Sequence, residues 1–307
     1  MQALKRVVAE MKVTILGANS YIARNLIFLL CHKVSQGKDI QLYLYDLQAV
    51  QADGREEYRQ VDILDAASLE QVCFDVDIIY MFIGKTGTVD GFGNYKTYIE
   101  INEVALLHVL SEYVRKKSHA KIMYPSTRLV YKGSMGKIHE NDEKQFLTVY
   151  AMNKYACEQY LEMYNRMFGV KYCILRICVP YGTMVPGAAS YGTAEFMLKR
   201  AENGEDITIY GEGDARRSMI HIEDLCEVLV RSALSSVCVN DAYNVGGEDV
   251  SLSEMASYVA DRYSVGVVHV QWPEEALKVE TGSTVFASDK LDTMIQYKSK
   301  HTFWEWL

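Results

Sequence analysis

Residues 12–23 read KVTILGANSYIA, and this stretch combines a strand, a tight turn and the start of a helix. Lys12 to Leu16 is rich in β-branched and aliphatic residues, which predicts a strand buried on both faces. Gly17 follows, where a glycine lets the backbone turn sharply and approach a ligand closely. A helix is expected from about Tyr21 to Lys33, and its first N–H groups would suit a phosphate. The turn therefore predicts either a dinucleotide site or a plain strand–helix connection.

Two aspartates follow the next expected strands. Asp46 closes a strand at Ile40–Tyr45, where a carboxylate can accept hydrogen bonds from an adenosine ribose. The same charge would repel a 2′-phosphate and so favours NAD over NADP, although Asp46 would also serve as a helix N-cap. Asp62 follows a short strand at Tyr58–Val61 and could either face the adenine or stand in an ordinary turn.

Strands and helices alternate as far as Ile177. Further strands are expected at residues 77–83, 121–124 and 172–177, with Pro125 ending the second, and helices at 67–72, 95–116 and 149–168. This rhythm predicts an α/β fold with a doubly wound parallel sheet, Rossmann-like, in residues 11–178 plus 218–247. The later pattern is irregular, so residues 179–217 plus 248–307 are expected to form a smaller C-terminal α/β lobe that binds substrate.

Composition and charge argue against a protein that binds nucleic acid or membranes. Lys and Arg number 32 against 40 Asp and Glu, which gives −8, and no basic cluster stands out. This balance argues against nucleic-acid binding and against an anionic membrane surface. The longest apolar run, Leu26–Cys31, is too short to span a bilayer, and the start, MQALKRVVAE, is no apolar leader, so a cytoplasmic protein is expected. The seven cysteines lack disulfide or zinc spacing, and no metal site is expected.

Tyr150 and Lys154 carry the sharpest chemical signal. They stand four residues apart on the expected helix 149–168, so the phenol and the ammonium share one face. A nearby cation favours phenolate and would lower the tyrosine pKa from about 10 towards that of a general base. Thr127, at the end of the strand upstream, could hydrogen-bond the same substrate oxygen. With 22 tyrosines, such a pair also arises by chance on solvated helices, and Thr127 could simply cap a turn.

The order of several motifs resembles the extended short-chain dehydrogenase/reductase superfamily, in its NAD-dependent epimerase/dehydratase branch. The resemblance covers nearly all of residues 12–300. It rests on the turn at Gly17, Asp46, Asp62, the loop after MFIG at Gly84, Asn102, PSTRLVYKG (125–133), the Tyr150/Lys154 pair, LRICVPYG (175–182), YGEGDARRSMIHIEDL (210–225) and YNVGGEDVSL (243–252).

The resemblance implies a role for each matching residue. Tyr150 would be the acid/base that exchanges a proton with a sugar hydroxyl, Lys154 would lower its pKa and bind the nicotinamide ribose, and Thr127 would hydrogen-bond the reacting oxygen. The implied cofactor-binding residues are Gly17, Ser20, Tyr21, Ile22, Asp46, Asp62, Ile63, Ile83, Gly84, Lys85, Tyr150 and Lys154. The implied substrate-binding residues are Thr86, Thr127, Tyr150, Val179 and Arg217, of which Arg217 would pair with the substrate diphosphate.

The chain departs from the family pattern at three places. Ser20 and Ala23 replace two of the usual glycines of the cofactor turn. Arg128-Leu129 stands where sugar-nucleotide 4,6-dehydratases carry Asp-Glu, so dehydration is not expected. Val179 replaces a frequent Asn that touches the sugar nucleotide, which leaves a different sugar pose open.

The leading interpretation is an NAD-dependent nucleotide-sugar 4-epimerase that oxidises C4 transiently and reduces it again. A nucleotide-4-keto-6-deoxysugar 4-ketoreductase using NAD(P)H would need the same residues, and a non-catalytic NAD-binding regulator is a third hypothesis. The expected partners are a nucleoside diphosphate sugar and a second copy of the chain. In the family, helices matching those around Asn102 and Tyr150 form a dimer interface, which here would involve Val104, Leu107, Leu110, Tyr160, Leu161 and Tyr164, unless these residues only face the monomer's own sheet.

Overall fold

The computed structural model describes residues 10–34, 39–188 and 192–307. Its centre is a seven-stranded sheet in the order β10-β6-β5-β4-β1-β2-β3, with every neighbouring pair parallel. The strands are β1 (Glu10–Leu16), β2 (Asp39–Asp46), β3 (Tyr58–Gln60), β4 (Ile78–Met81), β5 (Lys121–Thr127), β6 (Lys171–Ile177) and β10 (Ala242–Val245). The chain winds outward from β1 to β3, then crosses back to β4 and winds the other way. This order confirms the predicted doubly wound sheet and places its switch point at β1 and β4.

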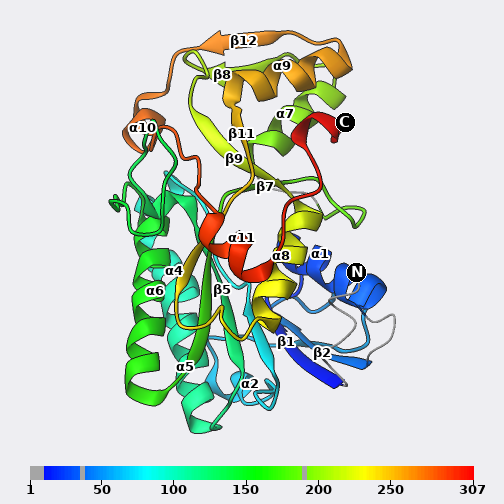
Figure 1. The fold of residues 1–307 in the computed structure, drawn as a ribbon, viewed down its shortest axis with the longest axis vertical. Coiled ribbons are helices and arrows are strands. Elements are labelled where there is room, and N and C mark those ends of the chain that lie inside the picture. The colour runs from blue at the N-terminus through cyan, green and yellow to red at the C-terminus, as the bar shows by residue number, and fades with distance from the viewer. Residues whose placement is uncertain (1–9, 35–38, 189–191) are drawn as a thin grey trace.

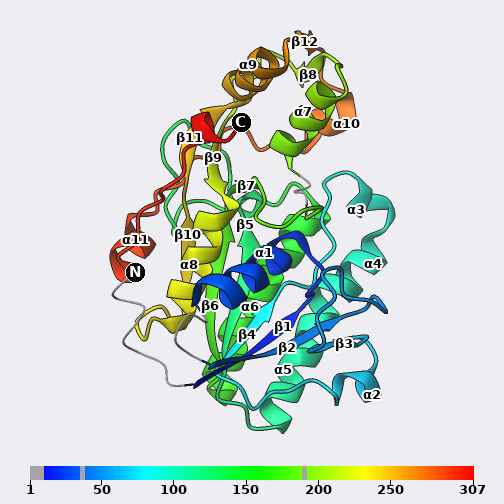
Figure 2. The same ribbon diagram turned by 90° about the vertical axis from the view of Figure 1, so that its right-hand side faces the viewer.

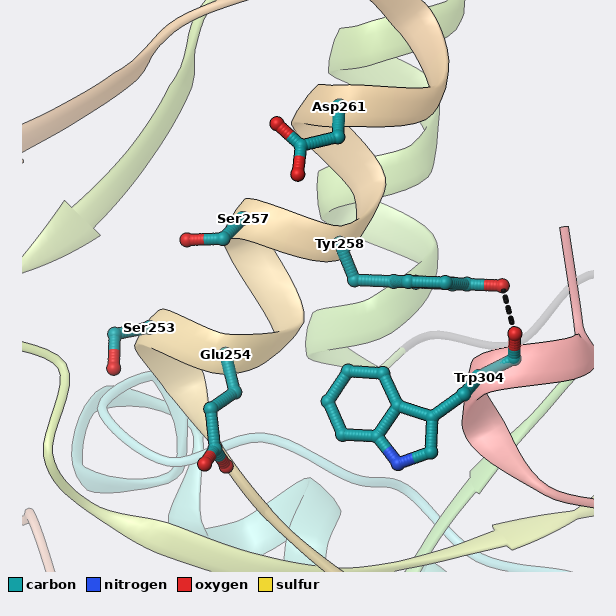
Figure 3. Close-up of a pocket in the computed structure, with 6 residues that line it drawn as sticks. All are labelled: Ser253, Glu254, Ser257, Tyr258, Asp261 and Trp304. Atoms are coloured by element: carbon teal, nitrogen blue, oxygen red, sulfur yellow. Dashed lines mark hydrogen bonds between the residues drawn. The ribbon is translucent and has the colours of Figure 1, made fainter.

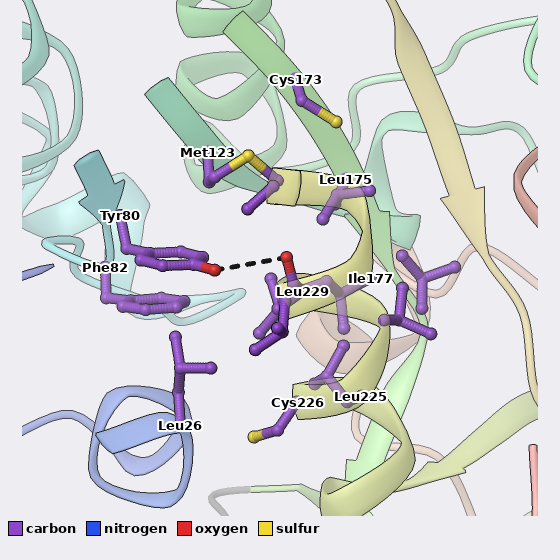
Figure 4. Close-up of a cluster of buried hydrophobic side chains, with 14 of the residues drawn as sticks. Leu26, Tyr80, Phe82, Met123, Cys173, Leu175, Ile177, Leu225, Cys226 and Leu229 are labelled. Atoms are coloured by element: carbon purple, nitrogen blue, oxygen red, sulfur yellow. Dashed lines mark hydrogen bonds between the residues drawn. The ribbon is translucent and has the colours of Figure 1, made fainter. Parts of the chain in front are cut away.

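Helices cover both faces of the sheet (Figures 1 and 2). α1 (Tyr21–Leu29) and α8 (Ile222–Leu234) pack on one face, whereas α5 (Ala105–Arg115) and α6 (Val149–Phe168) pack on the other. Figure 4 shows side chains of α8 meeting those of the central strands. The Tyr80 hydroxyl is buried there and donates to the Leu229 carbonyl at 3.3 Å, so this polar atom keeps a partner inside the apolar core.

A smaller set of elements lies beyond one end of the sheet and has an apolar core of its own (Figure 1). Its strands form a three-stranded sheet, β11-β9-β7, and a two-stranded sheet, β12-β8. The elements are β7 (Val179–Tyr181), α7 (Thr193–Glu202), β8 (Ile207–Tyr210), β9 (Arg216–His221), β11 (Glu248–Ser251), α9 (Leu252–Tyr263) and β12 (Val267–Val270). α9 begins at a capping box in which Ser251 and Glu254 satisfy each other's backbone N–H groups.

The C-terminal segment is shared between the two cores. After α10 (Glu274–Lys278), Phe286 together with Leu291 and Ile295 of α11 (Asp289–Ile295) joins the core under α8. Phe303 instead joins the core of the smaller set of elements. The division into a cofactor domain and a substrate lobe stays a prediction. Because residues 274–307 contribute to both cores, a boundary between two such domains would have to divide this C-terminal segment.

β5 runs through Pro125 to Thr127, so the prediction that Pro125 ends the strand is wrong. Pairing with β4 stops at Tyr80 and Met123, whereas pairing with β6 continues to Thr127 and Ile177. Pro125 therefore lies past the residues that bond to β4, where a missing N–H costs no ladder hydrogen bond on that side.

Two of the predicted helices contain π-helical segments. α1 is followed directly by a π-helical segment at Leu30–Val34. A second π-helical segment, Glu100–Val104, joins α4 (Tyr95–Ile99) to α5. The helix expected at 67–72 is the shorter α2 (Ala66–Leu69), and α3 (Asp90–Gly93) lies in an expected loop. Within the described residues, no helix has the length and apolar character needed to cross a membrane.

The turn at Gly17 has no room for a side chain. Its φ is +85°, and a Cβ would lie 2.8 Å from both the Ile83 nitrogen and the Phe82 carbonyl carbon. Because the backbone N–H of Gly17 also donates to the Tyr45 carbonyl at 2.8 Å, the turn cannot move away freely.

We expect Gly17→Ala to lower the free energy of unfolding by about 2–5 kcal/mol, from the left-handed backbone and the overpacking together. Gly54→Ala is the matched control, because Gly54 has φ +68° but nothing within 4 Å of a Cβ. Its loss should stay near 1–2 kcal/mol, the cost of the left-handed backbone alone. Urea unfolding of both variants measures the difference, and equal losses would contradict the close contact at Gly17.

Candidate active site

A cavity of about 440 Å³ opens at the carboxyl ends of β4, β5 and β6, beside the first turn of α1. Of the residues predicted for the site, it is lined by Ser20, Tyr21, Ile22, Ile83, Gly84, Thr86, Thr127, Tyr150 and Lys154. Those that do not line it are Gly17, Asp46, Asp62, Ile63, Lys85, Val179 and Arg217. Leu129 and Cys178 also line it, and no sequence pattern had marked Cys178 as a site residue.

Tyr150 and Lys154 reach the cavity from the first turns of α6. Thr148 caps this helix by accepting a hydrogen bond from the Ala151 N–H at 3.0 Å, and Gly169 ends it in the left-handed conformation, as predicted. The ammonium of Lys154 is buried and donates to the Pro125 carbonyl at 2.7 Å. Burial lowers the pKa of Lys154 to about 8, which leaves the amine mostly protonated at neutral pH.

Burial raises the pKa of Tyr150 to about 12, and the Thr127 hydroxyl is close enough to the phenol to act in the opposite direction. This rise contradicts the expectation that Lys154 lowers the tyrosine pKa. Desolvation outweighs the other effects on the phenol, and the ammonium is bound to the Pro125 carbonyl instead.

A buried polar network holds α6 against the strands that carry Thr127. Glu158, one turn beyond Lys154, pairs with Arg176 of β6 at 2.6 Å and accepts a hydrogen bond from the Ser126 hydroxyl. Arg176 also donates to the Tyr131 hydroxyl at 2.6 Å. The exposed fractions of the Glu158 and Arg176 side chains are 2% and 6%. Sequence reasoning missed this network, and the four-residue step from Lys154 to Glu158 was the signal that could have found it.

Asn102 fixes the loop that follows β4. Its side-chain oxygen accepts from the Lys85 N–H at 2.9 Å, and its amide donates to the Lys85 carbonyl at 3.0 Å. Gly84 lies so close that a Cβ there would be 3.1 Å from the same oxygen. Asn102 sits in the π-helical segment between α4 and α5, a type of irregularity often found at functional sites.

The two predicted aspartates have different surroundings. Asp46 ends β2 and accepts from the backbone N–H of Asn19 at 2.9 Å and of Leu47 at 2.8 Å, so it braces the turn after Gly17. Asp62 is exposed and accepts from the Leu64 N–H at 2.9 Å, which makes it a turn residue in this structure.

Arg217 lies in β9 with its side chain only 4% exposed. It pairs with Glu280 at 2.6 Å and donates to the Gly282 carbonyl. Val179 is partly buried at the start of β7, and Ile63 is buried in the core next to α5. In the described ranges, no group of three His, Cys, Asp or Glu side chains could hold a metal ion.

A second hollow of about 430 Å³ lies on α9 (Figure 3). It is lined by Ser253, Glu254, Ser257, Tyr258, Asp261 and Trp304, and none of the predicted site residues is among them. The chemistry therefore belongs to the cavity at the sheet edge.

The model of the family described as "NAD dependent epimerase/dehydratase family" matches residues 13–246. This chain belongs to that family. It is 23% identical to CDP-paratose 2-epimerase of Salmonella typhi over 94% of this chain and 95% of that protein. The family-wide cofactor is NAD, and the protein is an NAD-dependent enzyme of the extended short-chain dehydrogenase/reductase kind.

Solved structures share the fold. UDP-glucose 4-epimerase of Thermus thermophilus, in complex with NAD, has a TM-score of 0.82 and 20% identity, with 96% of each chain covered. UDP-N-acetylglucosamine 4-epimerase of Methanobrevibacter ruminantium, in complex with UDP-N-acetylmuramic acid, has a TM-score of 0.80 and 19% identity, covering 95% of this chain and 94% of that one.

The geometry of the cofactor half fits NAD. Gly17 keeps the turn before α1 tight against the backbone of Phe82 and Ile83, and the positive end of the α1 dipole borders the cavity through Ser20 and Ile22. Lys154 lines the same cavity.

Proposed function

We propose that this protein is a cytoplasmic NAD-dependent nucleotide-sugar 4-epimerase. The observation that carries the proposal is the chemistry of the cavity wall around Thr127. Tyr150 and Thr127 both line the cavity, with Thr127 close enough to affect the pKa of the phenol, and Leu129 lines the wall where a 4,6-dehydratase would carry a carboxylate. Epimerisation needs one group that takes a proton and gives it back, whereas elimination of water needs a further acid and base.

The residues of the chain divide the work as follows. Thr127 and Tyr150 would hold the sugar C4 hydroxyl between them, and Tyr150 would take its proton during oxidation and return it during reduction. NAD, when bound, supplies the acceptor and later the donor of the hydride at C4. Lys154 would position the nicotinamide ribose and keep a positive charge near the phenol. Leu129, Ile177 and other apolar side chains in the wall would exclude water from the keto sugar.

The substrate we propose is a nucleoside diphosphate sugar. The names of two similar proteins support this class, because both CDP-paratose 2-epimerase and UDP-glucose 4-epimerase are named for a nucleoside diphosphate sugar. Thr86 lies in the cavity wall, where it could contact the sugar, and Val179 follows Cys178 of that wall in the chain. Arg217 would meet the diphosphate.

The reaction is tested with UDP-, dTDP-, GDP- and CDP-sugars in the absence of added cofactor. We expect interconversion of C4 epimers without net NADH, and Tyr150→Phe should lower turnover roughly 10²–10⁴-fold while NAD stays bound. Tyr155→Phe, on the same helix, is the control and should leave turnover unchanged. Turnover confined to a 4-keto sugar with NAD(P)H would favour the ketoreductase instead, and no turnover of any sugar would favour the regulator.

We propose that Asp46 selects NAD over NADP. Its carboxylate is partly exposed beside the Gly17 turn, so it can accept from a ribose hydroxyl and would repel a 2′-phosphate. Titration of apo-protein should show tighter NAD than NADP binding, and Asp46→Asn should shrink that ratio about tenfold or more, since hydrogen bonds to charged groups contribute about 1.5–3 kcal/mol. The ratio is the informative readout, because loss of the Asn19 contact would weaken both dinucleotides alike. A ratio that stays constant would refute this role.

We also propose a homodimer through α6 and the helix before it. Leu110 and Leu161 are fully buried against the sheet, so these two predicted interface residues cannot take part. Val104, Leu107, Tyr160 and Tyr164 are partly exposed. Met152 and Met163, which are 50% and 43% exposed, stand three helical turns apart on one face of α6.

Light scattering at micromolar concentration should give a mass near twice the 34.9 kDa of the chain. Met152→Glu with Met163→Glu should shift the protein to monomer, because two buried charges would lack partners in the interface. Met135→Glu is the control, since Met135 is fully exposed and does not belong to α6. A monomer mass for the unmodified protein would exclude this assembly.

A further inference from the structure

The cavity wall next to Thr127 is built from apolar side chains. Leu129 stands two residues after Thr127, lines the cavity and is partly exposed. Its backbone N–H donates to the Thr127 hydroxyl oxygen at 3.2 Å, so this donor is used within the turn. A ligand held at Thr127 therefore meets the isobutyl group of Leu129 as its neighbour on this strand.

The end of β6 continues the apolar wall. Ile177 is the partner of Thr127 in the parallel ladder between β5 and β6, so the two side chains lie next to each other. Ile177, Cys178 and Pro180 all line the cavity. The Cys178 thiol donates to the Gly246 carbonyl at 3.5 Å, and a proline has no backbone N–H to donate. This part of the wall suits a group that forms no hydrogen bonds.

These two segments bring no charged side chain into the cavity. Arg128 stands between Thr127 and Leu129 but does not line the cavity, and its guanidinium lies 3.2 Å from the Thr284 hydroxyl instead. Among the described residues that line the cavity, Lys154 alone has a basic side chain, and its ammonium donates to the Pro125 carbonyl. An acid group placed against Leu129 would lose water and find no partner on that side chain.

Hydroxyl groups reach the cavity from a different element. Thr86 and Thr88, in the loop after β4, line it and are exposed. They can hydrogen-bond the hydroxyls of a sugar whose reacting carbon is held by Thr127 and Tyr150. A bound sugar would thus meet hydroxyl groups along the β4 loop and apolar side chains at the ends of β5 and β6.

We propose that a methyl-bearing substituent of the sugar binds against the apolar wall formed by Leu129, Ile177, Cys178 and Pro180. The inference rests on the proposed nucleotide-sugar function and narrows its substrate class. The methyl group is that of a 6-deoxysugar or that of an N-acetyl group. It gains from burial here, whereas a hydroxyl in its place would lose water against side chains that offer no hydrogen bond. These residues determine specificity and take no part in proton transfer.

The test compares four sugars, each linked to the same nucleoside diphosphate, by calorimetry on the NAD-loaded protein. The nucleotide is whichever of UDP, dTDP, GDP and CDP binds most tightly by itself, so that its contribution cancels. The sugars are glucose, 6-deoxyglucose, N-acetylglucosamine and glucuronic acid. One methyl-bearing probe should bind about 10–100-fold more tightly than the glucose probe, the range typical of one small group in an apolar pocket. The preferred probe identifies the source of the methyl group, and the glucuronic acid probe should bind no more tightly than glucose.

A variant of the wall tests the assignment to Leu129. Leu129→Gln brings in an amide that can hydrogen-bond a hydroxyl, so it should lower the preference for the methyl-bearing probe about tenfold. Leu277→Gln is the matched control, because Leu277 is 55% exposed and does not line the cavity, and it should keep the preference. The ratio of the two affinities is the informative readout, since a loosened site would weaken both probes alike. If Leu129→Gln fails to fold, the preference of the unmodified protein still decides.

The outcomes separate this subsite from the proposed reaction. Equal binding of the glucose, 6-deoxyglucose and N-acetylglucosamine probes, or tightest binding of the glucuronic acid probe, would overturn the subsite even if the protein interconverts C4 epimers. A preference that Leu129→Gln leaves unchanged would also overturn it. A preference for a methyl-bearing probe in a protein that interconverts no sugar would keep the subsite and remove the epimerase. Failure of every nucleotide sugar to bind would remove both.

Discussion

The buried pair between Glu158 and Arg176 is the interaction on which the proposed site depends. It joins α6, which carries Tyr150 and Lys154, to β6 and, through the Ser126 hydroxyl, to β5 one residue before Thr127. Removing one partner of such a pair typically costs about 3–5 kcal/mol, because the other charge stays buried and unpaired. A helix held this firmly keeps the Lys154 ammonium at the Pro125 carbonyl and the Tyr150 phenol at Thr127.

Around the rest of the cavity, side chains hold the loops by hydrogen bonds to their backbone rather than by ion pairs. Asn102 holds both polar groups of the Lys85 backbone, and the π-helical segment around it turns this side chain inward at the point where two regular helices meet. On the cofactor side, Gly17 packs its α-carbon against the end of β4, and Asp46 accepts from the Asn19 N–H. These hydrogen bonds keep the loop at Lys85 and the turn at Gly17 in fixed positions. Fixed positions matter because catalysis requires the substrate and the catalytic groups to be held in the correct relative orientation.

The fold and part of the candidate site could be predicted from the amino-acid sequence. Periodicity and the Gly17 turn predict the doubly wound parallel sheet because they are local signals, and the spacing of Tyr150 and Lys154 predicts that both side chains share one face, which here lines the cavity. Local reasoning failed at Pro125, because whether a proline ends a strand depends on where the neighbouring strand stops. It also missed the pairing of Glu158 with Arg176, since this pair joins a helix to a strand that follows it in the chain.

The pKa values in the cavity constrain how the chemistry can run. Burial raises the pKa of the Tyr150 phenol to about 12, so the phenol keeps its proton at pH 7. Lys154, with a pKa of about 8, still carries its proton at that pH, but its ammonium donates to the Pro125 carbonyl. Proton transfer to Tyr150 must therefore coincide with a gain of positive charge beside the phenol. Either reorientation of Lys154 or the cationic ring of oxidised NAD would provide it, so the base would become effective only when cofactor and substrate are both in place.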